Sequence, residues 1–159
     1  TSPPPSTPPT PTTTPMPIPT PRCPSRYTLY STDCGNFCYR INAKSCITWD
    51  RARADCQADN ADLWAPDVCS YPDFQQIVKI ATDEEGTCSS VWTGAFRRLP
   101  SANYVTVQGD PLPDNFPFWN EGQPVSDIKE DMCVRMLGGL GNLIMGVQCI
   151  NRFGVLCKT

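Results

Sequence analysis

The chain of 159 residues contains no histidine. Without an imidazole group it cannot form a histidine-based catalytic triad, a histidine metal site or a histidine pH switch. Its formal net charge is only −3, and it has no basic run and no patch that mixes basic and aromatic residues, so we expect no nucleic-acid partner. No apolar stretch approaches the roughly 20 residues that cross a bilayer, so we expect no membrane span.

Catalytic motifs are missing as well. The sequence has no nucleophile motif, no glycine-rich phosphate loop and no metal-binding triad. Two acidic pairs, Glu84–Glu85 and Glu130–Asp131, are adjacent in the sequence. The two carboxylates of a glycosidase must instead be positioned apart and in different environments, which adjacency does not provide. We therefore expect a protein that is not an enzyme.

Cysteine, in contrast, is abundant: there are ten residues, an even number. No closely spaced cysteine pair has a matching second pair or a histidine pair, so a zinc site is not indicated. Five disulfide bonds formed in an oxidising compartment explain the count, and we predict a secreted or extracellular protein. No signal peptide opens the sequence, and we interpret Thr1 as the start of a processed chain or of a fragment.

Residues 1–21 contain only Pro, Thr and Ser with one Met and one Ile. Proline fixes φ and removes the N–H donor, so we predict an extended polyproline II arm of roughly 65 Å, at about 3.1 Å per residue. A stalk or linker is our first interpretation, and a strap that docks on a neighbour is the second. The chain has no N-glycosylation sequon, whereas hydroxyl side chains beside proline suit O-glycosylation. The candidates are Ser2, Ser6, Thr7, Thr10, Thr12, Thr13, Thr14 and Thr20.

The composition changes at Arg22, and residues 22–159 are predicted to form one α+β domain. Aromatic and polar residues alternate over residues 23–41 around a Cys-Gly-Asn turn, which predicts a hairpin. One helix is predicted from the N-cap Thr48 to about Asn60, and a second from about Pro72. Short strands are predicted at 91–96, 104–107, 132–136, 145–149 and 153–157.

The order of these motifs resembles the C-type lectin-like domain, over essentially all of residues 23–158. The motifs that carry the resemblance are residues 38–41 (CYRI), the spacing of Trp49, Ala52 and Cys56, residues 91–95 (VWTGA), the set Trp119, Gly122, Gln123 and Pro124 followed by residues 131–134 (DMCV), and the closing Cys157. The resemblance implies two helices, short antiparallel sheets and a long loop.

The same resemblance implies two core disulfide bonds, Cys56–Cys157 and Cys133–Cys149. The longer form of the family adds a bridge in the N-terminal hairpin, for which Cys23–Cys34 is the candidate. The pairs Cys38–Cys46 and Cys69–Cys88 then remain. Six cysteines outside the core pairs permit fifteen connectivities, so other pairings stay open.

Sugar-binding members of the family hold calcium with an oxygen-rich triplet, a downstream acid and a Trp-Asn-Asp triplet. The corresponding residues here are Gln123-Pro124-Val125, Asp131 and Ile144-Met145-Gly146, so only Gln123 and Asp131 keep a ligand side chain. Two ligands are too few for an ion that takes six to eight oxygens, and we expect no cofactor. The residues Gln123, Pro124, Asp127, Glu130 and Asp131 remain the candidate ligand surface, and Ser126, Asp127 and Glu130 would have to complete any unorthodox calcium site.

Other features have an ordinary structural interpretation. Trp49, Trp64, Trp92 and Trp119 resemble core residues of the fold and are predicted to be buried. Arg97 and Arg98 are interpreted as a solvated turn rather than as a contact for an acidic partner. The apolar residues 136–140 and 143–145 lie where the family binds calcium, and they would form either an exposed contact patch or part of the core.

We therefore predict a non-enzymatic structural or adhesive component of an extracellular matrix, coat or filament. It would act by contact with extracellular proteins or with copies of itself, and the arm would serve as a glycosylated stalk or a docking strap. The alternative is a carbohydrate-binding lectin, with a non-standard calcium site or without calcium, whose partners are glycans. A third interpretation, a defence or surface receptor head, uses the arm only as a spacer.

Overall fold

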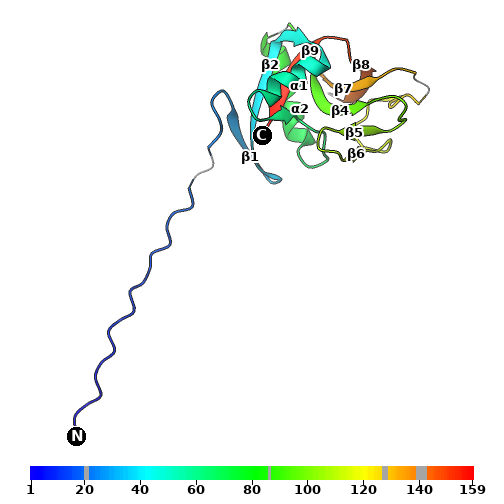
Figure 1. The fold of residues 1–159 in the computed structure, drawn as a ribbon. Coiled ribbons are helices and arrows are strands. Elements are labelled where there is room, and N and C mark those ends of the chain that lie inside the picture. The colour runs from blue at the N-terminus through cyan, green and yellow to red at the C-terminus, as the bar shows by residue number, and fades with distance from the viewer. Residues whose placement is uncertain (20–21, 86, 127–128, 139–142) are drawn as a thin grey trace.

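The computed structural model describes residues 1–19, 22–85, 87–126, 129–138 and 143–159. Residues 1–19 have no helix or strand and are exposed throughout. Figure 1 shows them as a single extended segment that points away from the folded part of the chain. Thr20, one of the predicted glycosylation candidates, lies outside the described residues.

The folded part contains two helices and nine strands within the described residues. The helices are α1 (Trp49–Gln57) and α2 (Tyr71–Glu85). The strands are β1 (Thr28–Thr32), β2 (Gly35–Ile47), β3 (Asp62–Leu63), β4 (Ser90–Arg97), β5 (Tyr104–Thr106), β6 (Pro111–Leu112), β7 (Met132–Leu137), β8 (Ile144–Gln148) and β9 (Phe153–Lys158). The predicted α+β class, with two helices and short strands, is confirmed.

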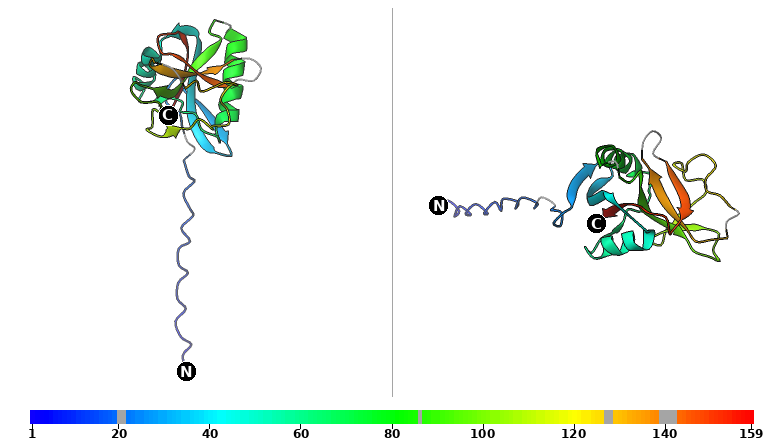
Figure 2. Two further views of the ribbon diagram at one scale, coloured as in Figure 1. Left: turned by 90° about the vertical axis from the view of Figure 1, so that its right-hand side faces the viewer. Right: turned by 90° about the horizontal axis from the view of Figure 1, so that it is seen from above.

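The strands form a sheet in the order β1-β2-β9-β4-β5-β6, and β7 and β8 branch from β4. The last strand lies between the N-terminal hairpin and the centre, antiparallel to β2 and parallel to β4. Figure 2 shows α1 and α2 on opposite sides of these central strands. In both figures the arm lies at one end of the folded part and the long loop after β6 at the other.

Helix α1 follows from the local sequence. Trp49, Ala52 and Cys56 are buried on one face, at the spacing of successive helical turns. Thr48 has the extended backbone of an N-cap, but its side chain makes no capping hydrogen bond. The helix ends at Gln57, earlier than predicted, because Asn60 turns into the left-handed region with φ of 57°.

The core lies on both sides of the sheet. The predicted burial of the four tryptophans is confirmed: Trp49, Trp64, Trp92 and Trp119 are 1%, 0%, 0% and 7% exposed. Their indole N–H groups also find partners inside the domain. Trp49 donates to the carbonyl of Thr93 and Trp92 to the carbonyl of Ile47, at 2.9 and 2.7 Å. Both bonds connect α1 and the adjoining chain to the central strand β4.

Five disulfide bonds connect all ten cysteines. Cys56–Cys157 joins α1 to β9, and Cys133–Cys149 joins β7 to the residue after β8. These are the two pairs that the family resemblance implies.

The other three predicted pairs were wrong. The structure joins Cys23 to Cys38, Cys34 to Cys69 and Cys46 to Cys88. The register of the hairpin explains the difference: Leu29 faces Cys38, whereas Cys34 lies in the turn at the far end. Cys23 enters beside the open end of the hairpin and therefore meets Cys38. Cys34, at the turn, reaches Cys69, which comes just before α2.

Candidate functional site

The long loop begins at Trp119, which is part of the core. Its ring packs at 5.2 Å from the ring of Tyr104, and its indole N–H donates to the carbonyl of Pro113 at 2.9 Å. Backbone hydrogen bonds join the loop to β8 on both sides of this residue, from Ile144 to Phe118 and from Asn120 to Ile144. The base of the loop is therefore held by the sheet, and it places Gln123 beside β8.

Gln123 uses its side-chain carbonyl inside the protein. Its Oε1 accepts a hydrogen bond from the backbone N–H of Gly146 at 3.2 Å. The backbone N–H of Gln123 donates to the backbone carbonyl of Asn120 at 2.9 Å. The next peptide bond, to Pro124, is cis. Gly146 in turn lies against the hydroxyl of Tyr104, which occupies the space that a Cβ would need. The third residue of the triplet, Val125, is apolar and exposed.

Asp131 is also engaged within the protein. Its carboxylate accepts the backbone N–H of Leu99 at 2.8 Å and pairs with the guanidinium of Arg98 at 3.3 Å. The Leu99 N–H first, and the Arg98 charge in addition, hold the pKa of Asp131 below its ordinary value. Arg98 also pairs with Asp50 at 2.9 Å, and these two carboxylates raise the pKa of Arg98 although burial opposes it.

Glu130 accepts a hydrogen bond from the side-chain amide of Gln148. Both residues line a hollow of about 340 Å³, together with Asp50, Arg98, Asp131 and Cys149. The lining carries three carboxylates and one guanidinium: Arg98 pairs with Asp50 and Asp131, and Glu130 is bonded to the neutral amide of Gln148. The predicted ligand surface is therefore split into a neutral part at Gln123 and an ion-paired part at Asp131.

The side chains on the long loop cannot supply the six to eight oxygen ligands that calcium takes. Gln123 Oε1 and the Asp131 carboxylate have internal partners, Val125 and Ile144 have no side-chain oxygen, and Gly146 has no side chain. Among the described residues no three carboxylate, cysteine or histidine side chains gather as a metal site would require. Asp127, which the sequence suggested as a further ligand, lies outside the described residues.

Two of the ordinary interpretations are now decided. Arg97 is 2% exposed, and its guanidinium lies over the ring of Tyr104 at 5.5 Å, so the interpretation as a solvated turn was wrong for this residue. In the apolar run, Met136 and Ile144 are fully buried and belong to the core. Leu140 lies outside the described residues.

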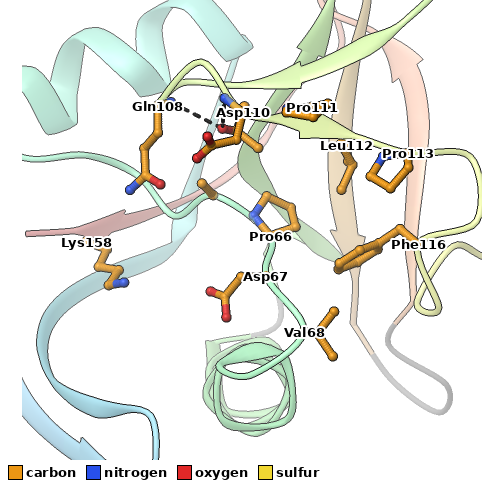
Figure 3. Close-up of a pocket in the computed structure, with 12 residues that line it drawn as sticks. Pro66, Asp67, Val68, Gln108, Asp110, Pro111, Leu112, Pro113, Phe116 and Lys158 are labelled. Carbon is orange, nitrogen blue, oxygen red and sulfur yellow. Dashed lines mark hydrogen bonds between the residues drawn. The ribbon is translucent and has the colours of Figure 1, made fainter.

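A groove that the sequence did not suggest lies beside the β5–β6 hairpin (Figure 3). We call it the proline-rim groove; it has a volume of about 440 Å³ and is lined by Ala65, Pro66, Asp67, Val68, Thr106, Gln108, Asp110, Pro111, Leu112, Pro113, Phe116 and Lys158. The loop before α2 forms one wall and the hairpin forms the other. The prolines Pro111, Pro113 and Pro117 indicate an irregular chain in this part of the sequence, but they do not predict a groove.

The chemistry of the proline-rim groove is mixed. Val68 is 58% exposed and offers an apolar contact, whereas Phe116 is almost buried. Asp67 accepts the backbone N–H of Ser70 at 2.8 Å as well as its hydroxyl, and these bonds fix the chain that enters α2. Asp110 and Gln108 are exposed on the other wall. Figure 3 shows Asp67 on the wall opposite Asp110.

Comparisons with known proteins agree with this geometry. The sequence matches the lectin C-type domain family over residues 45–159. Similar solved structures include a Ca²⁺-dependent type II antifreeze protein in its Ca²⁺-free form (TM-score 0.65, 23% identity, 86% of this chain and 99% of that chain). They also include a calcium-independent type II antifreeze protein (TM-score 0.66, 20% identity, 87% and 94%) and the C-type lectin CEL-I from Cucumaria echinata (TM-score 0.68, 18% identity, 87% and 97%).

At these identities the structural matches establish the fold alone. None of the helices in the described ranges is long and apolar enough to cross a membrane. The family match covers most of the chain, and it includes both helices, the core strands and the two core disulfides. The chain therefore belongs to the lectin C-type domain family.

Proposed function

We propose that this protein is a non-enzymatic, secreted structural or adhesive component of an extracellular matrix, coat or filament, and that it acts by protein–protein contact. One observation carries the proposal: the polar groups at the family's calcium position already form hydrogen bonds or ion pairs inside the domain. Gln123 is bonded to Gly146, and Asp131 to Leu99 and Arg98. These groups have little capacity left for an ion or for a sugar that an ion would bind.

Within this proposal residues 1–21 are an arm and residues 22–159 a lectin-like domain. The root of the arm is well anchored, because Cys23 is bonded to Cys38 and Arg26 pairs with Asp59 at 2.6 Å. The arm beyond it is extended and exposed, which suits O-linked glycans on its serines and threonines. It acts either as a glycosylated stalk or as a docking strap. The five disulfide bonds favour an oxidising, extracellular location.

Light scattering and electron microscopy of the full chain, with and without excess EDTA, test the proposal. We expect assemblies whose size depends on protein concentration and is unaffected by EDTA, because protein contacts hold them. The thermal midpoint is also expected to be the same with EDTA as with millimolar calcium. A monomer at every concentration, or a midpoint that falls in EDTA, contradicts the proposal.

A carbohydrate-binding function is the second candidate, and the proline-rim groove favours it. The exposed carboxylate of Asp110 and the amide of Gln108 lie on one wall of the groove and apolar Val68 on the other, which suits the hydroxyls and the C–H face of a sugar without any metal. Two of the structurally similar proteins point the same way: CEL-I is a C-type lectin, and the CD23 domain from cow was solved in the presence of an oligosaccharide.

A glycan array separates the two candidates. Calcium-independent binding that Asp110→Asn weakens at least about tenfold would establish the lectin function, since a hydrogen bond to a charged group is lost. Asp33→Asn, on the hairpin turn and outside the groove, is the matched control. An array without signal leaves protein contact as the remaining function.

A further inference from the structure

A second groove lies between the N-terminal hairpin and α2. We call it the tyrosine groove; it is lined by Tyr30, Tyr39, Ile41, Gln76, Ile77, Ile80, Ala81 and Glu84. Its volume of about 260 Å³ is below the roughly 300–1,000 Å³ of sites for small molecules. It is large enough, however, for a few side chains of an extended peptide. The floor is the main core cluster, against which Tyr30, Tyr39 and Ile41 pack.

Two disulfide bonds hold the walls of this groove in place. Cys34 in the hairpin turn is bonded to Cys69, just before α2, and Cys46 near the end of β2 is bonded to Cys88, just after α2. The helix is thereby fastened to the hairpin at both of its ends. A groove with fixed walls loses little conformational entropy when a ligand enters, so it is preorganised for binding.

The tyrosine groove presents hydrogen-bond donors that the protein does not use. The rings of Tyr30 and Tyr39 lie edge to face with centroids 6.2 Å apart. Within the described part of the chain neither hydroxyl has a hydrogen-bond partner. A tyrosine hydroxyl is protonated at neutral pH, and burial raises the pKa of Tyr39 further, so this group is a hydrogen-bond donor.

A polyproline II strand has the complementary chemistry. It makes no internal hydrogen bonds, so its carbonyl groups are free acceptors, and its prolines carry no N–H. Grooves lined by aromatic side chains bind such strands because the ligand is already extended and loses little entropy. This chain carries such a strand itself, in the exposed arm of residues 1–19.

Residues 15–19 (Pro-Met-Pro-Ile-Pro) are the part of the arm that suits the groove best. They form its longest stretch without a serine or threonine, so O-glycans on the neighbouring threonines leave them bare. Met16 and Ile18 are 89% and 92% exposed and are the only apolar side chains of the arm other than proline. With three residues per turn, Pro15 and Ile18 share one edge of the strand.

The proline-rim groove is a poorer match for this strand. Its carboxylates, Asp67 and Asp110, can only accept hydrogen bonds, and the strand also offers acceptors. The aromatic ring in its wall, Phe116, is 8% exposed and presents little surface.

The groove and the root of its own arm lie on opposite faces of the hairpin. Cys23 is bonded to Cys38, which packs with Tyr27 and Trp49 on the side of α1. Tyr39, the next residue along β2, points to the side of α2, since successive strand residues alternate. Figures 1 and 2 show the arm leading away from the domain rather than around the edge strand β1. Residues 1–19 are exposed throughout, so the arm does not occupy the groove of its own chain.

We propose that the tyrosine groove binds residues 15–19 of the arm of a second copy of this chain. The proposal rests on the proposed assembly function and names the contact that would produce it. Each copy has one arm and one groove, and the two surfaces are different. Contacts of this head-to-tail kind continue from copy to copy and generate a fibre unless they close into a ring.

A complementation experiment with full-length chains tests this contact. Ile80→Lys places a charge in the groove at a side chain that is 45% exposed, and the double variant Met16→Ser/Ile18→Ser removes the apolar groups of the arm. Each substitution is at an exposed position, so the fold is expected to persist. In sedimentation velocity each variant alone is expected to remain monomeric. An equimolar mixture is expected to form a one-to-one dimer, because it contains one intact groove and one intact arm.

The expected change in the association constant depends on which group each variant removes from the contact. Ile80→Lys is expected to lower the association constant about tenfold or more, because an apolar contact is lost and a charge is buried. Tyr30→Phe and Tyr39→Phe should each lower it by roughly two- to tenfold, since they remove only a hydroxyl donor. Val68→Lys, on the proline-rim groove and similarly exposed, is the matched control and should have no effect.

A labelled synthetic peptide of residues 10–19, titrated onto the Met16→Ser/Ile18→Ser chain, distinguishes failure of the contact from failure of the function. Fluorescence anisotropy should show saturable binding that Ile80→Lys abolishes. If the wild-type chain assembles but Ile80→Lys assembles equally well, the contact is wrong and the assembly function stands. If the wild-type chain is monomeric at every concentration, the assembly function fails, and peptide binding that Ile80→Lys abolishes then assigns the groove to the arm of the same copy.

Discussion

The long-loop face, which carries Gln123 and Asp131, and the tyrosine groove lie in different parts of one domain. They differ in whether their polar groups have partners inside the protein. On the long-loop face, Gln123 is bonded to Gly146 and Asp131 to Leu99 and Arg98. In the tyrosine groove, the hydroxyls of Tyr30 and Tyr39 have no partner among the described residues. A face whose groups are paired internally contributes to stability, whereas a face with free donors can contribute to binding.

Disulfide bonds support both regions but with different consequences. Cys133–Cys149 closes the base of the long loop, next to residues that are already hydrogen-bonded. Cys34–Cys69 and Cys46–Cys88 connect the two ends of α2 to the hairpin strands. They therefore fix the two walls of the tyrosine groove, and the groove between the walls stays open. The comparison leads to predictions for both regions, which begin with the largest expected effect.

Removal of Cys34–Cys69 is expected to have the largest effect. The double variant Cys34→Ser/Cys69→Ser releases a loop with a sequence separation of 35 residues, and we expect the free energy of unfolding to fall by about 3–4 kcal/mol. The walls of the tyrosine groove then move more freely, so binding of the arm peptide should weaken as well. Urea unfolding and fluorescence anisotropy measure the two effects.

Cys23→Ser/Cys38→Ser is the control for this variant, because that bond lies on the side of α1. It should lower stability by about 3 kcal/mol for its separation of 15 residues, with peptide binding unchanged. If both double variants weaken binding equally, the bond at Cys34 has no special role in the groove.

Gly146→Ala tests the internal packing of the long-loop face. The added methyl group meets the buried hydroxyl of Tyr104, and overpacking of this kind lowers the free energy of unfolding by about 1–3 kcal/mol. Adding Tyr104→Phe should restore most of the loss, since it removes the atom that the methyl group contacts. Urea denaturation of both single variants and the double variant gives the coupling energy.

Tyr104→Phe alone is expected to be neutral or slightly stabilising. The Tyr104 hydroxyl is buried without a hydrogen-bond partner in the described residues, and removing such a group relieves a desolvation penalty. A large loss of stability in this single variant would mean that the hydroxyl has a role that the contacts around Gly146 do not show.

Asp131→Asn should have the smallest effect of the substitutions that remove an interaction; it lowers stability at neutral pH, and the difference from the wild type disappears in acid. The hydrogen bond from the Leu99 N–H, and in addition the charge of Arg98, lower the pKa of Asp131 in the folded state. These contacts stabilise the protein above the ordinary pKa of about 4 and are lost as the pH falls below that value. The wild-type thermal midpoint should therefore drop more steeply than that of the variant as the pH falls below about 4. At neutral pH the variant should be the less stable protein.

Asp59 limits how far the acid sensitivity of the wild type and of Asp131→Asn can differ. Although desolvation opposes it, the charges of Arg26 and Arg40 lower the pKa of Asp59 too, so part of the acid sensitivity remains in Asp131→Asn. Asp33→Asn, on the exposed hairpin turn, serves as the control for removal of a carboxylate. Identical acid profiles for the wild type and Asp131→Asn would show that the pair with Arg98 is not formed in solution.

Local sequence patterns predicted much of the fold. The buried face of α1 follows from the spacing of Trp49, Ala52 and Cys56, and the type and order of the main strands follow from alternation and turn residues. The core disulfides were available only through the family resemblance. The end of α1 was placed too late, because the left-handed turn at Asn60 depends on one backbone angle that no periodicity shows.

The candidate site was less predictable. The sequence identified Gln123 and Asp131 as the remaining ligand side chains, but it could not show that Gly146 and Arg98 bind them, since these partners are distant in the chain. For the same reason Arg97 looked like a surface residue, although it is buried under Tyr104. The sequence predicted neither groove, because each is formed by segments that only the fold brings together.

The sequence by itself therefore determined what depends on near neighbours: the extended arm, whose prolines restrict each φ angle, and the helices and strands with one apolar face. Only the tertiary structure decided how the six cysteines outside the core pair, which polar groups on the long loop are hydrogen-bonded internally, and which tyrosine hydroxyls have no partner among the described residues. The physical reason is that disulfides and side-chain hydrogen bonds need two groups within a few ångströms. In this chain the hairpin register and the packing of α2 set those distances.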